Sequence, residues 1–534
     1  MNNIMKEELF DPSGGDFVIL RGTFSNWQGN DFVLEGGNRE GEYAATFSIP
    51  GDSGLVIEYK FLILKANGRV LWEKNPDSEN HPHGNRMLVL NGNDQELELG
   101  EFDFDRYYLA AVGKEVLFTI EELQLDFEQF RQILEREHCC LYEYTAKETF
   151  DSLFQKQRGL IDRSLPPNEF YKILTPITAK IGCMHTSVWM PGGYWDMEPG
   201  NLFPLRIKLI KDYVVVAGSY IDTLQVPVGS IILKINDRSI DDIIEKMRQN
   251  LSADAFNVNF INSQIEKRFP MIYARRSGFP EKYTVTYALP GRKTRESQLL
   301  IPADIQSVRK IVFTNFQHPN LSLELFEEIG TAIMTVKTFG YYDRVDYFRH
   351  FMDSSFQEIK EKKMSNLVLD LRGNDGGDPF CSVILFSYLE PQPLPYFAEA
   401  YGKYSELAEP IPQAENHFTG NLFTLLDGHC ASTNGHFSSL LKYHQIGKFV
   451  GTASGATYKC NAGKDAEVHL KHTGIILNFG RNTYAAAVHG IDKAKPIMPD
   501  YPITQTYRDF LEGRDVYLET ALELINNQSN LRDD

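Results

Sequence analysis

The chain has 534 residues and a formal net charge of −18, with 42% hydrophobic and 24% charged residues. This length exceeds the size at which one hydrophobic core stops growing, so the sequence predicts two to four domains. The acidic balance, without a cluster of Lys and Arg, argues against a nucleic-acid partner, because such a partner requires clustered positive charge.

No apolar run approaches the roughly 20 residues that a bilayer-spanning helix needs. Residues 1–17 also lack the apolar core of a secretory signal. We therefore expect no membrane span and a cytoplasmic protein, or an extracytoplasmic one if a signal peptide was removed. The six cysteines do not make a disulfide scaffold in so long a chain, and their spacing fits no metal site. We expect buried free thiols, no metal and no cofactor.

Residues 1–105 are predicted to form an all-β domain. Short apolar runs alternate with Gly, Asn, Asp and Pro turns, which is typical of a small antiparallel sandwich. The predicted strands are Phe17–Leu20, Tyr43–Ile49, Val56–Leu64, Arg69–Trp72 and Met87–Leu90.

Four segments of this domain, SNWQG, EYKF, VLWEKNP and GNRMLVL, follow one another in that order. The order resembles the starch-binding type of carbohydrate-binding module, in which two tryptophans stack on sugar rings beside a lysine and an asparagine. The resemblance implies that an α-glucan binds to Trp27, Lys60, Trp72 and Asn85. An exposed aromatic face suits this task because it covers the apolar face of a sugar. The alternative is that both tryptophans are core residues of a sandwich that binds no ligand.

Residues 106–202 are predicted to be a helical region. Thr119 and Glu122 have the spacing of a capping box. The periodic run behind them places apolar side chains on one helix face, namely Phe127, Phe130 and Leu134. His185 lies further along, between Gly182 and a predicted strand at 186–190. A lone histidine at such a boundary is more often structural than catalytic.

Residues 203–305 are predicted to form a separate module. Gly229 precedes an apolar strand at 231–235, and a helix beginning at 239–242 follows an Asn-Asp turn. This arrangement resembles a PDZ-like domain, whose groove takes an extended peptide as an added strand. The interval 250–285 does not fit that pattern and predicts a helical insertion. The alternative is a purely structural α+β module.

Residues 306–534 alternate between strands and helices, which predicts an α/β core. A strand at 333–336 and an amphipathic helix at 345–362 precede a continuous apolar strand at 367–371, typical of burial on both faces. That strand runs into a glycine-rich loop at 372–378, whose backbone can approach a ligand closely. The spacing of the loop matches neither the phosphate-loop nor the dinucleotide fingerprint.

Ser432 follows a short apolar strand and the Asp427-Gly428 turn, and it precedes a helical pattern. A serine on such a tight turn projects its hydroxyl outward. The free N–H groups at the start of the helix then suit an oxyanion. The alternative is that Ser432 or Thr433 only caps the helix, as these residue types commonly do.

The segments VLDLRGNDGGD, LLDGHCASTNGHF and KFVGTASGATY, with the tail from 497 to 525, resemble the C-terminal-processing and tricorn-type serine peptidases. The resemblance covers roughly residues 105 to 527 and implies a crotonase/Clp-like α/β peptidase core. It implies that Ser432 is the nucleophile. It also implies that the backbone N–H of Thr433, with one from Gly376 or Gly377, forms the oxyanion hole.

The general base differs between branches of this family. One branch uses a lysine about 25 residues after the serine, a position that falls on Thr457, with Lys459 two residues beyond. The tricorn-like branch uses a histidine from the preceding helical region, which His185 matches. Histidine has an ordinary pKa of about 6.5, whereas a lysine near 10.4 must be desolvated to act as a base. We therefore expect a Ser432–His185 pair, with Asp492 as the nearest counterpart of the acid that orients the histidine.

The sequence therefore predicts a multidomain α/β serine peptidase, either an endopeptidase or a carboxyl-end-directed enzyme. It is predicted to cleave polypeptides through an acyl-enzyme and to be tethered to α-glucan by its N-terminal module. The alternative is a catalytically silent protein that binds peptides and glycans on a peptidase fold.

Overall fold

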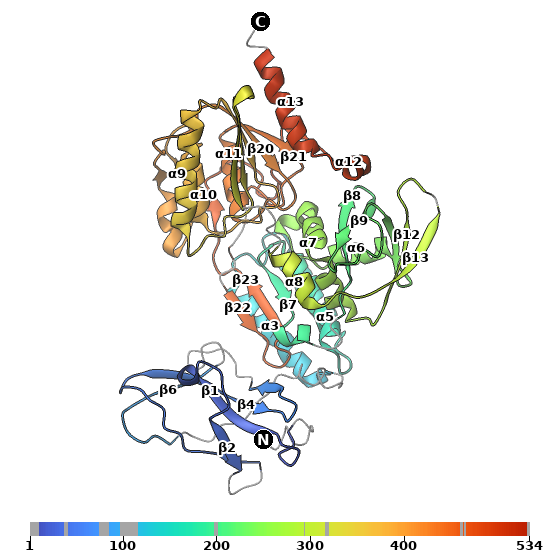
Figure 1. Cartoon of the computed structure of the whole chain (residues 1–534), viewed down its shortest axis with the longest axis vertical. Coiled ribbons are helices and arrows are strands. Elements are labelled where there is room, and N and C mark those ends of the chain that lie inside the picture. The colour runs from blue at the N-terminus through green and yellow to red at the C-terminus, as the bar shows by residue number, and fades with distance from the viewer. Residues whose placement is uncertain are drawn as a thin grey trace.

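The structure is a computed structural model that describes residues 10–36, 41–73, 85–96, 116–196, 201–292, 294–314, 320–459, 463 and 466–530. Within these ranges an N-terminal sheet, a helical region, an α+β unit and a C-terminal α/β unit follow one another (Figure 1). The predicted domain boundary near 105 lies outside the described residues. None of the described helices is long and apolar enough to cross a bilayer.

The N-terminal unit is one antiparallel sheet in the order β3-β2-β1-β4-β5, with β6 paired to β4. Ile19 and Leu62 face each other in the register of β1 on β4, and both are fully buried. The predicted strand at 43–49 is only two residues long, and the described residues form a single sheet of the predicted sandwich. The strands are β1 (Phe17–Gly22), β2 (Val33–Gly36), β3 (Tyr43–Ala44), β4 (Val56–Leu64), β5 (Val70–Trp72) and β6 (Arg86–Val89).

The helical region consists of α3 (Ile120–Glu137), α4 (Lys147–Arg158) and α5 (Pro167–Ile181). The predicted capping box is confirmed, since the Glu122 N–H donates to Thr119 Oγ1 at 3.3 Å and the Thr119 N–H donates to Glu122 Oε2 at 2.8 Å. The predicted apolar face of α3 is buried in the core of this region. The cap therefore sets where α3 begins, and the apolar face sets which side packs.

The α+β unit is a sheet in the order β13-β12-β10-β9-β8, with β11 paired to β10. Helix α6 buries Ile240, Ile243, Ile244 and Met247 against this sheet. Helix α7 occupies the interval predicted as a helical insertion and contacts both β8 and α5. The elements are β8 (Leu205–Ile210), β9 (Tyr213–Ser219), β10 (Ile231–Ile235), β11 (Arg238–Ser239), α6 (Ile240–Arg248), α7 (Val258–Ser277), β12 (Tyr283–Ala288) and β13 (Arg295–Leu300).

The C-terminal unit is a sheet in the order β14-β15-β16-β20-β21-β25, parallel except for the β14–β15 pair. Strand β16 is buried throughout, as its continuous apolar pattern predicts. The strands are β14 (Leu321–Phe326), β15 (Thr331–Val336), β16 (Asn366–Asp370), β20 (Asn421–Leu426), β21 (Lys448–Gly451) and β25 (Tyr501–Pro502).

Helices cover both faces of this sheet. One hydrophobic core includes side chains of α9 (Val345–Glu361), α10 (Pro379–Ser387) and α11 (Thr433–Tyr443), and another includes side chains of α13 (Val516–Asn530). Because β16 and β20 are parallel neighbours, the loops that follow them emerge at the same edge. The smaller elements are α8 (Ile305–Thr314), β17 (Leu394–Pro395), β18 (Phe397–Glu399), β19 (Pro410–Ile411), β24 (Ala485–Ala486) and α12 (Tyr507–Glu512).

A hairpin of β22 (Ala466–His469) and β23 (Ile476–Phe479) leaves the C-terminal sheet and pairs with β7 (Ser187–Trp189) of the helical region (Figure 1). Leu477 is fully buried in the core of that region. At the hairpin turn, the Asp126 carboxylate of α3 accepts the Thr473 N–H at 2.8 Å. The hairpin thus joins two units far apart in the sequence, and it positions the residues next to β7.

Candidate active site

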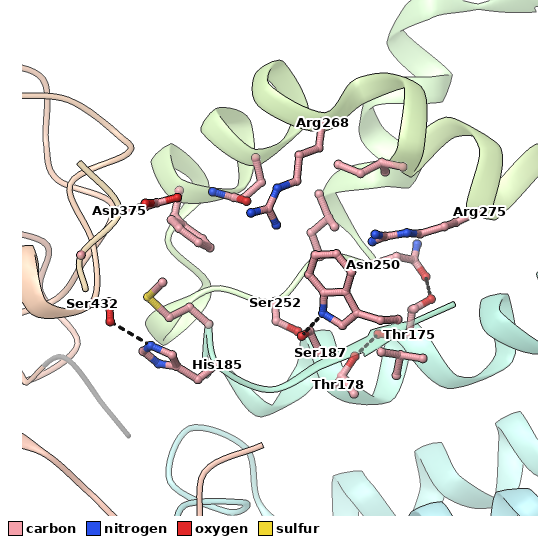
Figure 2. A pocket seen from close by; sticks show the side chains of 18 of the residues that line it. Thr175, Thr178, His185, Ser187, Asn250, Ser252, Arg268, Arg275, Asp375 and Ser432 are labelled. Carbon is pink, nitrogen blue, oxygen red and sulfur yellow. Dashed lines mark hydrogen bonds between the residues drawn. The ribbon is translucent and has the colours of Figure 1, made fainter. Parts of the chain in front are cut away.

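Ser432 occupies a strained turn between β20 and α11. Its φ is 54° and its ψ is −129°, a positive φ that non-glycine residues seldom adopt outside functional turns. The side chain makes no capping hydrogen bond to α11, so the capping alternative does not describe Ser432. Its Oγ lies instead 3.0 Å from His185 Nε2 (Figure 2). The turn therefore directs the hydroxyl out of the helix and toward an imidazole.

His185 sits in a short connection between α5 and β7. Gly182 ends α5 with a φ of 74°, and the Met184 N–H donates to Asp254 Oδ1 at 2.9 Å. On the other side of His185, Thr186 begins the approach to β7, which pairs with β23. The backbone is thus held on both sides of the imidazole, by a buried carboxylate and by the three-stranded sheet.

The imidazole of His138 contacts the connection between α5 and β7 that contains His185. His138 Nε2 lies 2.6 Å from Thr186 Oγ1, and the Cys140 N–H donates to His138 Nδ1 at 3.0 Å. Because Nδ1 accepts that hydrogen bond, neutral His138 carries its proton on Nε2 and donates it to Thr186. His138 therefore fixes the residue that follows His185.

Asp254 is a buried acid that the sequence pattern did not single out. It lies just before α7, and burial raises the pKa of its carboxyl to about 7, while the Met184 N–H acts in the opposite direction. Its Oδ2 has no hydrogen-bond partner among the described residues. No motif marks this position, because the acid acts on a backbone group contributed by a distant segment.

The glycine-rich loop after β16 folds back against Ser432. A Cβ at Gly376 would lie 2.8 Å from Ser432 Cβ and 2.9 Å from Thr433 N, so only glycine fits there. The Gly376 N–H itself donates to Asn374 Oδ1 at 2.9 Å. Of the two glycines that the sequence leaves open as oxyanion donors, Gly376 therefore has its amide already engaged.

The amides of Gly377 and Thr433 remain available. Neither N–H donates a hydrogen bond within the described part of the chain, and Thr433 is the first residue of α11, where the amide has no acceptor inside the helix. The Thr433 hydroxyl donates to the Gly377 carbonyl at 2.6 Å, which ties the two segments together. Two amides without an acceptor among the described residues thus lie on segments next to Ser432 that are fixed to each other.

A cavity of about 420 Å³ opens beside Ser432 and His185. Its walls come from α5, β7, α7 and the glycine-rich loop, so three of the four units contribute to it (Figure 2). Charged side chains on its wall are Arg268, Arg275 and Asp375. This volume matches that of a small ligand pocket.

The structure does not bring the other predicted candidates to Ser432. Lys459 forms an ion pair with Glu143 and lines a different cavity. Thr457 is buried and bridges to Pro496. Asp492 is exposed, and its Oδ1 accepts the N–H of nearby Ala494 at 3.0 Å. Among the residues described, no group of three His, Cys, Asp or Glu side chains could hold a metal ion.

The predicted glycan residues lie on the N-terminal sheet. Trp27 and Trp72 are half-buried side by side, with ring centroids 6.3 Å apart and ring planes at 49°. Burial lowers the pKa of Lys60 on β4. The Asn85 amide donates to Glu58 Oε2 at 2.7 Å. The structure thus brings the two tryptophans together and engages the asparagine with a neighbouring carboxylate.

Comparisons with known proteins bear on the C-terminal unit and on the fold. No curated protein sequence matches the chain. Among solved structures, mature CPAF complexed with lactacystin is 12% identical, with a TM-score of 0.55 over 76% of this chain and 99% of that chain. A second structure of mature CPAF gives the same identity and TM-score over 76% and 98%. At this identity the likeness concerns the fold.

Residues 330–501 match the family model of peptidase family S41. The match includes the glycine-rich loop, the Ser432 turn and the strands β15, β16, β20 and β21 that carry them. We conclude that this multidomain α/β protein carries a peptidase family S41 domain.

Proposed function

We propose that the protein is a serine peptidase that cleaves polypeptides through an acyl-enzyme, with Ser432 as nucleophile and His185 as general base. The observation that carries this proposal is the 3.0 Å contact between Ser432 Oγ and His185 Nε2, beside two unengaged backbone amides. The peptidase family S41 match over residues 330–501 supports the same reaction class.

The proposed mechanism assigns a group to each step. His185 Nε2 accepts the hydroxyl proton while Ser432 Oγ attacks the carbonyl carbon of a peptide bond. The N–H groups of Gly377 and Thr433 then donate to the oxyanion of the tetrahedral intermediate. Protonated His185 passes its proton to the leaving amine. A water molecule, deprotonated in turn by His185, hydrolyses the acyl-enzyme.

The substrate is proposed to be a polypeptide that reaches the site along α7. This helix belongs to the α+β unit and forms a wall of the cavity beside Ser432. The cavity accepts side chains near the cleaved bond, while the rest of the peptide lies outside it. Both an endopeptidase and a carboxyl-end-directed peptidase fit this geometry, and the lengths of the products distinguish them.

A fluorophosphonate probe tests the nucleophile directly, because it reacts with an activated serine hydroxyl. We expect labelling of the wild type at Ser432, identified by peptide mass, and none in Ser432→Ala. The labelled protein should also lose the ability to cleave an unfolded protein substrate. A wild type that is folded but neither labels nor cleaves would favour the alternative, a catalytically silent peptide-binding protein.

A second function, binding of α-glucan by the N-terminal sheet, is favoured by the Trp27–Trp72 pair. Two adjacent aromatic rings offer stacking surface for consecutive sugars. Trp72→Ala should lose retardation in a glycogen-containing native gel, whereas Phe17→Ala, which removes an aromatic side chain that is 52% exposed on β1, should keep it. Equal mobility of the wild type with and without glycogen would contradict the binding.

A further inference from the structure

Helix α7 presents two arginines to the cavity that contains Ser432 and His185. Arg268 and Arg275 both line it, and Arg275 is only 4% exposed. They lie seven positions apart on α7, which is kinked at Arg268, where φ is −129° and ψ is 22°. Both guanidinium groups point from the helix toward the cavity (Figure 2).

The charge on the cavity wall is not balanced. Asp375 is the one carboxylate that lines the cavity within the described residues, and its Oδ2 lies 2.7 Å from the Lys267 ammonium. Burial lowers the pKa of Arg268, and the nearby Arg275 lowers it further, against the opposing effect of Asp375. Arginine keeps its charge even when buried. The two guanidinium groups therefore repel each other in a site of excess positive charge.

Stacking explains where Arg275 sits but does not satisfy its donors. Its guanidinium carbon lies 4.3 Å from the ring centroid of Trp189 and 5.6 Å from that of Trp195. Such contacts cover the faces of the guanidinium group, whereas its N–H donors lie in its plane. The Nε and Nη2 atoms are buried without a hydrogen-bond acceptor among the described residues. The group thus has two buried in-plane donors without an acceptor among the described residues, on a side chain that lines the cavity.

A carboxylate has the complementary form. Its two oxygens accept parallel hydrogen bonds from one guanidinium group, and its charge compensates the excess on the wall. Neutral polar groups lie close by, since the Thr175 hydroxyl donates to Asn250 Oδ1 at 3.2 Å on the same wall. We propose that Arg275, with Arg268 beside it, binds a carboxylate of the polypeptide substrate, so that the enzyme selects acidic substrates. The inference rests on the proposed function in taking the ligand to be a polypeptide.

The experiment compares matched fluorogenic peptides. In one arm a single Glu occupies each position in turn of an amidated peptide, with Gln at the same position as control. In the other arm the same Gln peptide carries a free or an amidated C-terminus. The first arm reports a side-chain carboxylate and the second a terminal one. We expect the acidic member of one arm to be cleaved with a kcat/KM about 10- to 100-fold higher, as charged hydrogen bonds typically give.

The preference should depend on Arg275. In Arg275→Met, which keeps the apolar stem, it should fall to about twofold or less, and Arg275→Lys should retain only part of it because lysine lacks the bidentate fork. Arg276→Met is the matched control, since Arg276 is the next residue of α7 and does not line the cavity. Thermal unfolding establishes that each variant is folded.

Binding measurements on Ser432→Ala separate this inference from the proposed function. Fluorescence anisotropy of the same peptides reports recognition without turnover. If the wild type cleaves peptides but shows no acidic preference in either arm, the carboxylate site is refuted while the peptidase function stands. If nothing is cleaved but Ser432→Ala binds the acidic peptides in an Arg275-dependent way, the peptidase function fails and the carboxylate site stands.

Discussion

Replacing Gly376 with alanine should damage catalysis far more than folding. The added Cβ would lie 2.8 Å from Ser432 Cβ and 2.9 Å from the Thr433 nitrogen, inside ordinary contact distance of both. It would therefore press between the nucleophile and one of the two amides proposed to hold the oxyanion. The carbonyl oxygen of a substrate could no longer reach the Thr433 N–H without a shift of the loop.

The contacts and the φ of Gly376 indicate the expected losses of activity and of stability. Loss of one oxyanion donor typically raises the barrier by about 2.7–4 kcal/mol, so kcat should fall by about 100- to 1000-fold. The φ of Gly376 is 103°, which an alanine seldom adopts. This strain should lower the free energy of unfolding by about 1–3 kcal/mol.

Gly373→Ala is the control from the same loop. Gly373 has a φ of 80°, yet its Cβ would meet nothing within 4 Å. The Gly373→Ala variant should therefore lose stability through backbone strain alone, and its kcat should stay within about threefold of that of the wild type. Steady-state hydrolysis of a peptide ester at saturating substrate measures kcat, and urea denaturation measures stability. Similar kcat values for the two folded variants would refute the placement of the oxyanion beside Gly376.

Three further outcomes follow from groups around the site. His185→Ala should lower kcat by at least about 100-fold, whereas Lys459→Ala should leave it nearly unchanged, and the reverse in steady-state assays would assign the base to the lysine. Asp254 has a folded pKa of about 7, above its ordinary 3.8, so the free energy of unfolding should fall by up to roughly 4 kcal/mol as pH rises from 4 to 7. Asp254→Asn keeps an acceptor for the Met184 N–H, and its thermal unfolding should lose that pH dependence. The same pH profile in this variant as in the wild type would contradict the assignment to Asp254. A hydrogen bond from the Cys139 thiol lowers the pKa of the Cys140 thiol to about 7, so iodoacetamide should modify Cys140 at half its maximal rate near pH 7. Cys139→Ala should move that midpoint to higher pH, and peptide mass mapping identifies the modified residue. An unchanged midpoint in Cys139→Ala would show that the two thiols are not coupled.

Local patterns in the sequence predict the elements well where the controlling interactions are local. The capping box at Thr119 and Glu122 sets the start of α3 through two hydrogen bonds between residues three apart. The four apolar residues of α6 fall on one face because of the helical period alone. The turn at Ser432 is likewise visible in its order of strand, Asp-Gly turn and helix. Each of these features depends on a few neighbouring residues.

Features that depend on contacts between distant segments could not be predicted from local sequence patterns. Periodicity does not reveal that β23 pairs with β7, since any apolar strand can pair with many partners. Both glycines of the oxyanion loop look equivalent in sequence, and only the Asn374 side chain distinguishes their amides. The two unmet donors of Arg275 likewise depend on α7 turning toward the cavity. In each case the missing information is a long-range contact.

The three-stranded sheet of β7, β22 and β23 makes the position of His185 depend on residues that follow the Ser432 turn in the chain. The β22–β23 hairpin, which pairs with β7 next to His185, is synthesised after the Ser432 turn. A nascent chain that stops before residue 476 cannot form the pairing of β23 with β7, although it already contains Ser432 and His185. Under the proposed function, the active site is therefore complete only once β23 has paired with β7, after the proposed nucleophile has been synthesised.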